Sequence, residues 1–409
     1  MTYESALKKL KENGQEHVLH YYNDLSAREQ EALLAQIEET DFSMLTTKEK
    51  EAGKTLSRGR IEPLEALQLD AIREKDAYYR GIGLKALKEG KVGAVLLAGG
   101  MGTRLGSDDP KGMYDIGLTK HVYIFQRIME NTMDVVRECG AWIPFFVMTS
   151  DKNHDATTRF FEEHDYFGYP KEEILFFKQD MAPASDYNGK VYMESPCKMS
   201  TSPNGNGGWY ISMNRAGITD LIHKKGIEWL NIFAVDNVLQ RIADPVFVGA
   251  VLDTGSDVGS KVVRKASPDE RVGVMCLEDG KPSIVEYYEL SDEMRVAKNE
   301  KGEYAYNYGV ILNYLFNVKA LERIMDQNLP LHVVEKKIAH IDADGNEVHP
   351  EAPNGYKYEQ LVLDMIHELD TCLPFEVVRE KEFAPIKNRE GVDSVDTARE
   401  LLKKNGYEL

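Results

Sequence analysis

From residue 92 onward, short apolar runs alternate with amphipathic segments, and this alternation constrains the fold more than any other feature of the sequence. Four runs predict strands that are covered on both faces: KVGAVLLAGG (residues 91–100), WIPFFVMTS (142–150), EILFFKQ (173–179) and EWLNIFAVDN (228–237). The segments between them have the spacing of helices, at residues 121–139, 154–164 and 207–226. Strands that alternate with helices in this way indicate an α/β fold with a mainly parallel, doubly wound, Rossmann-like sheet.

The regions on either side of this core have other patterns. Residues 1–90 show helical patterns only, and Ser26 with Glu29 three residues later predicts a capping box at the start of a helix. Beyond residue 258, short apolar runs predict antiparallel strands beside the main sheet, and the last part predicts helices and a strand at 358–369, 395–406 and 374–380. The predicted division of the 409 residues is a helical subdomain (1–90), an α/β ligand-binding domain (91–330) and a small α+β region that completes it (331–409).

Charge and composition exclude several classes of partner. The chain has 68 acidic and 50 basic residues, a net charge of -18, which argues against binding to nucleic acid or to an anionic membrane surface. No apolar run reaches the length of a membrane span, and the N-terminus has no signal-peptide pattern. The four cysteines are widely separated, which indicates buried, reduced thiols and a cytoplasmic protein rather than a disulfide framework.

The glycine-rich segment LLAGGMGTRLGSDDPKGMYDIG (residues 96–117) follows the first buried strand and fits neither of the two common phosphate-binding motifs. A dinucleotide fingerprint needs a third glycine where this chain has Leu105, and Pro110 interrupts the helix that should follow. A Walker A loop needs its lysine directly after a glycine, whereas Lys111 follows the proline. What remains is a loop that holds Arg104 and Lys111 near exposed backbone N–H groups, which suits a triphosphate. The alternative is a turn that is rich in glycine for tight packing alone.

This segment resembles the signature of the UDP-sugar pyrophosphorylases, and GTRLG with PKGMYD is most similar to the eukaryotic-type UDP-N-acetylhexosamine pyrophosphorylases. The resemblance covers about residues 92–390 and returns, in chain order, at EEHDYFGYPKEEILFFKQDMAPA, SPNGNGGWY, FAVDNVLQRIADPVFVG, VVRKASPDERVGVM, IVEYYEL, HPEAPNGYKYEQLVLD and EFAPIKN. It implies a nucleotide-diphospho-sugar transferase fold and an enzyme whose partners are UTP, a sugar 1-phosphate, a UDP-sugar and pyrophosphate. In that reaction the sugar phosphate attacks the α-phosphorus of UTP in line.

The resemblance also implies which residues bind the uridine. The set comprises three groups: the backbone of the first strand end and its turn, a strand-end amide, and a glycine near the base. These residues are Leu97, Ala98, Gly99, Gly100, Gln179 and Gly205. Glycines let a ligand approach the backbone closely, and an amide can donate and accept at once, as the uracil edge requires.

Four cations are implied at the phosphates. Arg104 and Lys111 would bind the triphosphate and neutralise the leaving pyrophosphate, and Lys357 and Lys387 match two later lysines that reach the phosphates. Arg104, Lys111 and Lys387 are the expected catalytic residues, with Lys387 also contacting the sugar phosphate. Because the two later lysines come from distant sequence, we expect a C-terminal segment that closes over the site.

A metal ion and the sugar complete the implied site. Asp236 follows the apolar run NIFAV and is the expected ligand of Mg²⁺, although it could instead cap a helix that begins at VLQRI. Glu286 and Tyr287 resemble the family's sugar-binding pair, and Asn206 would lie near the sugar. For Glu286 the alternative is an exposed position on an antiparallel strand.

One position departs from the family. The hexosamine enzymes carry the pattern NAGN, whereas this chain has NYGV, with Val310 in place of an asparagine that helps to hold the sugar. A valine cannot bond a hydroxyl, so N-acetylglucosamine 1-phosphate is expected first, with N-acetylgalactosamine and glucose 1-phosphates as alternatives. A UDP-glucose or broad UDP-sugar pyrophosphorylase, and a regulatory protein that only binds nucleotide sugars, are the competing hypotheses. A monomer or weak homo-oligomer is expected, and the bifunctional bacterial enzyme is disfavoured because no hexapeptide repeat is present.

Overall fold

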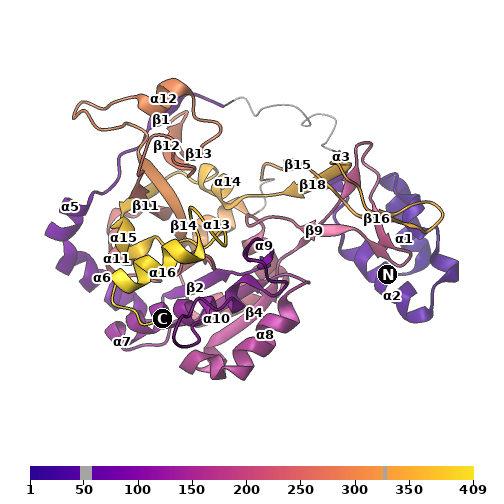
Figure 1. Ribbon diagram of the computed structural model, residues 1–409, viewed down its shortest axis with the longest axis horizontal. Coiled ribbons are helices and arrows are strands. Elements are labelled where there is room, and N and C mark those ends of the chain that lie inside the picture. The colour runs from indigo at the N-terminus through magenta and orange to yellow at the C-terminus, as the bar shows by residue number, and fades with distance from the viewer. Residues whose placement is uncertain (47–57, 326–328) are drawn as a thin grey trace. The chain divides into compact units, whose positions relative to one another are not determined.

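The computed structural model of the protein describes residues 1–46, 58–325 and 329–409 (Figure 1). Backbone contacts divide the chain into two compact units, and each unit is built from three separate segments. Unit 1 contains Met1–Ser57, Asp180–Gly208 and Asn328–Val362, and unit 2 contains Arg58–Gln179, Trp209–Gln327 and Leu363–Leu409. The division at residues 90 and 330 stays a prediction.

Unit 2 contains a sheet of ten described strands whose central part is parallel. Its main path has the order β1-β12-β14-β10-β2-β3-β4, and β11, β13 and β19 pair beside this path. The parallel strands are β10 (Trp229–Ala234), β2 (Val92–Leu97), β3 (Phe145–Thr149) and β4 (Ile174–Lys178). Every residue of β2 and β3 is buried, as a strand covered on both faces should be. The predicted doubly wound α/β sheet is confirmed.

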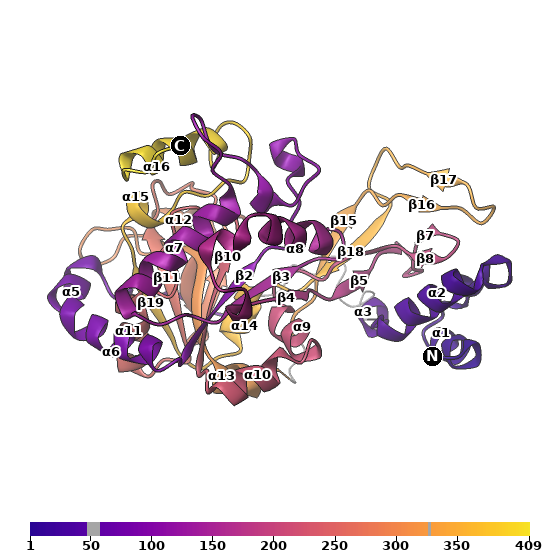
Figure 2. The same ribbon diagram turned by 90° about the horizontal axis from the view of Figure 1, so that it is seen from below.

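Helices cover both faces of this parallel core. Helices α7 (Ile124–Cys139) and α8 (His154–Glu163) lie on one side of the sheet, and α9 (Trp209–Arg215) and α10 (Ile218–Lys225) lie on the other (Figure 2). The single helix predicted over residues 207–226 is wrong. Gly217 adopts a φ of 71°, a left-handed conformation that separates α9 from α10.

The remaining strands extend the sheet, mainly in the antiparallel sense that the sequence predicts. β14 pairs antiparallel with β10 and β11, and β12 pairs antiparallel with β1 and β13, whereas β19 is parallel to β11. Their bounds are β1 (Ile61–Pro63), β11 (Val258–Arg264), β12 (Val274–Glu278), β13 (Lys281–Val285), β14 (Tyr308–Asn317) and β19 (Cys372–Glu376). The other helices of this unit are α5 (Leu69–Glu74), α6 (Asp76–Lys88), α11 (Pro245–Thr254), α12 (Asp292–Val296), α13 (Val318–Ile324), α15 (Arg379–Glu382) and α16 (Val395–Lys404).

Three local expectations are wrong, two of them because pairing with another strand decides the structure. The region predicted as helical only contains β1, whose Ile61 pairs with Glu278 of β12. The predicted strand SIVEYYEL ends at Val285. The helix predicted over residues 358–369 is divided into β18 (Gly355–Glu359) and α14 (Val362–His367), because β18 pairs with β15 (His332–Lys336).

Unit 1 packs the N-terminal helices on short strands from two later segments. Helix α2 (Ala27–Glu39) begins with the predicted capping box, since Ser26 and Glu29 bond each other's backbone N–H groups. The Gln36 amide bonds both backbone groups of Met199, at 2.8 and 3.1 Å, and so joins α2 to β8. The other elements are α1 (Tyr3–Glu12), α3 (Ser43–Thr46), β5 (Met181–Pro183), β6 (Ser185–Asp186), β7 (Met193–Ser195), β8 (Lys198–Met199), β9 (Thr201–Pro203), β16 (His340–Ile341) and β17 (Glu347–Val348).

Thiols and possible membrane spans were also predicted from the sequence. Cys139 and Cys276 are buried as expected, Cys197 and Cys372 are half-buried, and all four thiols are free. None of the helices in the described ranges has the length and apolar character needed to cross a membrane.

Candidate active site

The predicted site lies where two parallel strands end in register. Leu97, the last residue of β2, is paired with Ala234, the last residue of β10, and the Val235 N–H donates to the Leu97 carbonyl at 3.3 Å. Gly99 and Asp236 therefore follow neighbouring strands at the same level. β3 lies beside β2 on its other side, so the strand order reverses here. Such a reversal is the usual ligand position in open α/β sheets.

Gln179 lies directly against the glycine turn. Its backbone N–H donates to the Thr149 carbonyl at 2.8 Å, which continues the pairing of β4 with β3. A Cβ atom on Gly99 would lie only 2.6 Å from the Gln179 Nε2 atom. The Gln179 side chain is nearly buried, at 7% exposure, and its amide makes no hydrogen bond with any other residue the structure describes. The amide is therefore held at Gly99 with its bonding capacity unused.

Hydrogen bonds fix the shape of the glycine-rich loop. Met101 forms a bridge with Pro110, and the Lys111 N–H donates to the Gly100 carbonyl at 3.2 Å. The Asn153 amide, which is fully buried, donates to the carbonyls of Ala98 and Gly100 at 2.9 and 3.3 Å. Sequence reasoning missed Asn153. Its only signal was a polar residue just beyond the strand that neighbours the loop.

The two cations of this loop have no partner among the described residues. Arg104 is exposed on the short 3-10 turn Thr103–Leu105, and Lys111 is half-buried at the start of the 3-10 turn Lys111–Met113. Over residues 1–46, 58–325 and 329–409, neither side chain forms a hydrogen bond or an ion pair. Arg104 and Lys111 can therefore each donate to an anionic ligand, although the same loop also carries Asp108 and Asp109 between them.

Asp236 lies beside the segment that carries Lys387. The Ile386 N–H donates to the Asp236 carbonyl at 2.9 Å, and Asn237 forms a bridge with Pro385. The Asn237 side chain donates to the Glu382 carbonyl at 2.7 Å and accepts from the Ala384 N–H at 2.9 Å, so it clamps this segment onto the turn. Asp236 itself is half-buried.

The carboxylate of Asp236 is available for a ligand. It has no hydrogen bond or ion pair within the described parts of the chain. The alternative role as a helix cap is wrong, because residues 237–244 form no helix and Asp244 caps α11 instead. Lys387 forms an ion pair with Asp393 at 3.4 Å.

A buried ion network holds Glu382, which precedes the segment that carries Lys387. Lys261 is fully buried, and its ammonium donates to the Arg241 carbonyl at 3.0 Å, to Asp244 at 3.2 Å and to Glu382 at 2.5 Å. Burial opposes the ionisation of Asp244, but Lys261 and Arg241 outweigh it and lower its pKa. Burial raises the pKa of Glu382, although Lys261 counteracts part of this rise.

The predicted sugar-binding pair lies at the end of β13. Glu286 is the first residue after the strand, which corrects the alternative that placed it within a strand. Its N–H donates to the Glu289 carboxylate at 2.9 Å, and Tyr287 is partly exposed. A Cβ atom on Gly273 would lie 3.5 Å from Val310 and 3.7 Å from the Glu286 carboxyl carbon. Val310 and Glu286 are therefore close neighbours around Gly273.

An arginine that sequence reasoning missed anchors this hairpin. Arg58 donates to Glu278 at 2.9 Å, to Glu289 at 2.6 Å and to the Ile284 carbonyl at 3.2 Å. Burial opposes the charge of Arg58, but the bonds to both carboxylates outweigh it and raise its pKa. Through Glu289, this contact also fixes the backbone of Glu286.

Three predicted residues belong to unit 1. Gly205 has a φ of 88°, and a Cβ atom there would lie 2.2 Å from the Gln360 carbonyl oxygen, so only glycine fits. The Asn206 side-chain oxygen accepts from the Val362 N–H at 3.0 Å, which leaves its NH₂ group for a ligand. Lys357 lies on β18, paired with Val334 and half-buried. The predicted site residues thus form one group in each unit.

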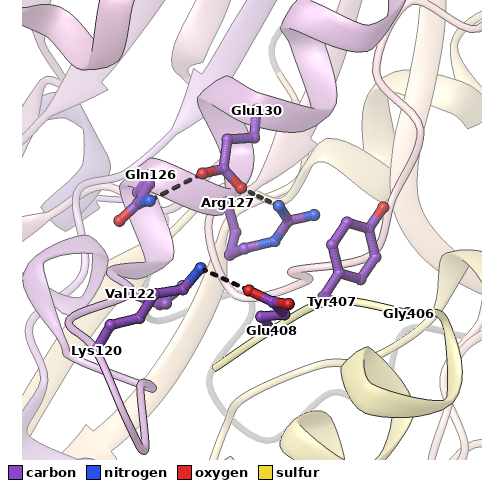
Figure 3. A pocket seen from close by; sticks show the side chains of 8 residues that line it. All are labelled: Lys120, Val122, Gln126, Arg127, Glu130, Gly406, Tyr407 and Glu408. Atoms are coloured by element: carbon purple, nitrogen blue, oxygen red, sulfur yellow. Dashed lines mark hydrogen bonds and ion pairs between the residues drawn. The ribbon is translucent and has the colours of Figure 1, made fainter.

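A separate cavity of about 230 Å³ lies in unit 2, next to helix α7 (Figure 3). Lys120, Val122, Gln126, Arg127, Glu130, Gly406, Tyr407 and Glu408 line it, and none of these is a predicted site residue. Lys120 pairs with Glu408 at 3.8 Å, Arg127 pairs with Glu130, and Arg127 stacks on the Tyr407 ring. Because both cations are neutralised, this cavity offers no evident phosphate site.

Comparisons with known proteins show the family to which the chain is similar. Residues 39–401 match the family described as UTP–glucose-1-phosphate uridylyltransferase. The chain is 37% identical to the UDP-N-acetylglucosamine pyrophosphorylase of Saccharomyces cerevisiae over 97% of this chain and 88% of that protein. It is 36% identical to the human UDP-N-acetylhexosamine pyrophosphorylase-like protein 1 over 98% of this chain and 83% of that protein.

A solved structure has the same fold. The uridine diphosphate N-acetylglucosamine pyrophosphorylase of Trypanosoma brucei, in complex with an inhibitor, superposes with a TM-score of 0.82 at 28% identity. The match covers 98% of this chain and 84% of that one.

Proposed function

Because the chain belongs to the UTP–glucose-1-phosphate uridylyltransferase family, we propose that it joins UTP to a sugar 1-phosphate and releases pyrophosphate. This proposal rests on one observation: the glycine loop, Gln179 and Asp236 lie together at the ends of neighbouring strands, where the strand order reverses. We propose N-acetylglucosamine 1-phosphate as the main sugar substrate, supported by the names of the yeast and trypanosomal relatives. Glucose 1-phosphate and N-acetylgalactosamine 1-phosphate are the alternatives.

The glycine turn and Gln179 bind the uridine in this proposal. With the backbone groups of Leu97, Ala98, Gly99 and Gly100 on one side, the Gln179 amide can donate to one uracil carbonyl and accept from the ring N–H. We propose that the backbone of Gly205, whose missing side chain gives room to the Gln360 carbonyl, contacts the base. The result is recognition of uracil by paired hydrogen bonds rather than by charge.

Cations of the chain stabilise charge on the phosphates. Arg104 and Lys111 bind the β- and γ-phosphates and neutralise pyrophosphate as the bond to the α-phosphorus breaks. Lys387 orients the attacking oxygen of the sugar 1-phosphate, and Lys357 contacts the nucleotide phosphates. No covalent bond to the protein forms, so positioning and electrostatics supply the catalysis.

The residues present fit a Mg²⁺ ion that arrives with the nucleotide. Among the described residues, no three of His, Cys, Asp and Glu come together as a metal cage. The unpartnered carboxylate of Asp236 suits an ion that takes one or two protein carboxylates and several phosphate or water oxygens. Such an ion would polarise the phosphate oxygens at the reacting phosphorus.

The sugar-binding part rests on Glu286, Tyr287 and Asn206. The Glu286 carboxylate accepts from sugar hydroxyls, Tyr287 shapes the pocket beside it, and the Asn206 NH₂ group donates to the sugar. Val310, next to Glu286, offers an apolar contact instead of an amide. We therefore propose weaker discrimination between sugars than an asparagine would give at this position.

Pyrophosphate release tests the proposed function. UTP, Mg²⁺ and each of the three sugar 1-phosphates are mixed with the protein, and we expect release with N-acetylglucosamine 1-phosphate to be fastest. EDTA and Asp236→Asn should each reduce the rate by at least about 100-fold, while Asp220→Asn, an exposed aspartate of α10, should leave it unchanged. No release with any sugar would refute the enzyme and favour a regulatory nucleotide-sugar binding protein.

We further propose a cytoplasmic monomer or weak homo-oligomer. The free thiols support a reducing compartment, and the net charge of -18 supports the proposal that neither nucleic acid nor an anionic membrane is a partner. Size-exclusion chromatography with light scattering measures the mass in solution. A stable large oligomer would contradict this proposal.

A further inference from the structure

The segment after Lys387 forms a closed turn with a fixed base. The N–H groups of Lys387 and Asn388 both donate to the Asp393 carbonyl, at 2.7 and 3.1 Å. The Asn388 side chain donates to the Val392 carbonyl at 3.0 Å. Since Ile386 bonds Asp236, the base of the turn is attached to the proposed metal site, and residues 389–392 form its tip.

The tip of this turn brings Arg389 to the glycine loop. A Cβ atom on Gly106 would lie 3.6 Å from the Arg389 Nη1 atom, a van der Waals distance. Gly106 ends the 3-10 turn that carries Arg104, with a φ of 78°. Two segments almost three hundred residues apart therefore present cations to the same loop.

Arg389 has no structural task that would explain this position. Its side chain is exposed and forms neither a hydrogen bond nor an ion pair with the residues whose placement is described. By contrast, the neighbouring Lys387 is paired with Asp393, and Arg399 of α16 bonds two carbonyls. Within the described ranges, Arg389 is thus a third unpaired cation at the glycine-rich loop, beside Arg104 and Lys111.

Three cations at one loop match the chemistry of pyrophosphate better than that of the sugar. Pyrophosphate carries several negative charges within a small volume, and its charge grows as the bond to the α-phosphorus breaks. A guanidinium can bind two phosphate oxygens at once through parallel N–H groups. Uracil and sugar hydroxyls offer no such charge.

We propose that Arg389 is a further phosphate-binding residue, which contacts the pyrophosphate portion of UTP and the released pyrophosphate. The inference rests on the proposed uridylyltransferase function and deepens it. The turn that carries Arg389 is attached at Asp236 through the Ile386 N–H, and its tip reaches the glycine-rich loop at Gly106.

Kinetics in the reverse direction test this role. With UDP-N-acetylglucosamine and pyrophosphate as substrates, Arg389→Ala should raise the KM for pyrophosphate about tenfold and leave the KM for the UDP-sugar within twofold. Arg389→Lys should recover part of the loss, since it keeps the charge without the paired donors. The matched control is Arg73→Ala, an exposed arginine of α5, which should change neither constant.

Two outcomes would overturn the proposal, and both differ from failure of the proposed function. An unchanged KM for pyrophosphate in Arg389→Ala would exclude the contact, as would an equal rise in both KM values. If the wild-type protein turned over no sugar, titration calorimetry with pyrophosphate and Mg²⁺ would still compare the two proteins. Equal affinity of wild type and Arg389→Ala would then refute the role of Arg389 by itself.

Discussion

Removing the charge of Lys261 should destabilise unit 2 strongly. The ammonium is fully buried and donates to one carbonyl and two carboxylates within 3.2 Å. Methionine has a similar length, so Lys261→Met leaves the packing nearly intact. The carboxylates of Asp244 and Glu382, however, lose their buried ammonium partner. Removing one partner of a buried ion pair costs about 3–5 kcal/mol. Arg241 remains beside Asp244 at 3.2 Å, so we expect a loss of about 3 kcal/mol at pH 7.

The tryptophans of the chain make this loss measurable. All three of them, Trp142, Trp209 and Trp229, belong to unit 2, so tryptophan fluorescence during urea unfolding reports on this unit. The free energy of unfolding extrapolated to water gives the difference between variant and wild type.

The same variant should respond to pH in a defined direction. Burial raises the pKa of Glu382, and without Lys261 this rise is no longer counteracted, so the folded state takes up a proton there more readily than the unfolded state does. Stability therefore increases as the pH falls, and the deficit of Lys261→Met should shrink between pH 7 and pH 5. In the wild type the lowered pKa of Asp244 has the opposite sign, since its contribution is lost only when acid protonates it.

Matched variants separate this network from a general effect of losing a lysine. Lys281→Met, at an exposed position of β13, should change the free energy of unfolding by less than about 0.5 kcal/mol. Combining Lys261→Met with Glu382→Leu should recover part of the loss, because an uncompensated carboxylate is removed. A deficit below about 1 kcal/mol for Lys261→Met, or one that grows in acid, would refute the reasoning.

Three further predictions concern the proposed binding residues. Gly99→Ala should raise the KM for UTP about tenfold with little change in melting temperature, because its Cβ atom displaces only the flexible end of Gln179, 2.6 Å away; an unchanged KM would contradict this. Gly205→Ala should cost at least about 3 kcal/mol, because the left-handed φ is strained and the Cβ atom meets the Gln360 carbonyl oxygen at 2.2 Å. Far-UV circular dichroism during heating measures this loss, and an unchanged melting temperature would disprove it. Val310→Asn should raise the ratio of kcat/KM for N-acetylglucosamine 1-phosphate to that for glucose 1-phosphate about tenfold, because one hydrogen bond contributes about that factor. A constant ratio would contradict a role of Val310 in sugar selectivity.

The sequence predicted the fold and the place of the site wherever a local pattern or a general rule of sheet topology decides the structure. Apolar runs alternating with helices predicted the parallel core, and the rule that ligands bind at carboxyl ends of strands predicted that Gly99, Gln179 and Asp236 lie together. The structure confirms this neighbourhood, whereas the roles of these residues stay predictions.

The features that the sequence did not predict depend on partners far along the chain. Nothing near Ile61 indicates a strand, because its partner Glu278 lies more than two hundred residues away. Arg58 and Asn153 were missed for the same reason, since each acquires its role only when the fold brings its acceptors together. Gly217, in contrast, was a local signal for a helix end that the helical pattern on either side concealed.

The interleaved composition of the two units has a consequence for biosynthesis. Unit 1 needs residues as late as Val362, and unit 2 needs the residues after it, so neither unit is complete when the parallel core has left the ribosome. At that stage the nascent chain contains the glycine-rich loop and Asp236, but it lacks Ile386, whose N–H donates to the Asp236 carbonyl in the folded protein. At about 5–20 residues per second, the stretch from the end of β10 to Lys387 takes roughly eight to thirty seconds to translate. During this interval the apolar strands lack β19 beside β11, so an unpaired strand edge is exposed to association with other chains.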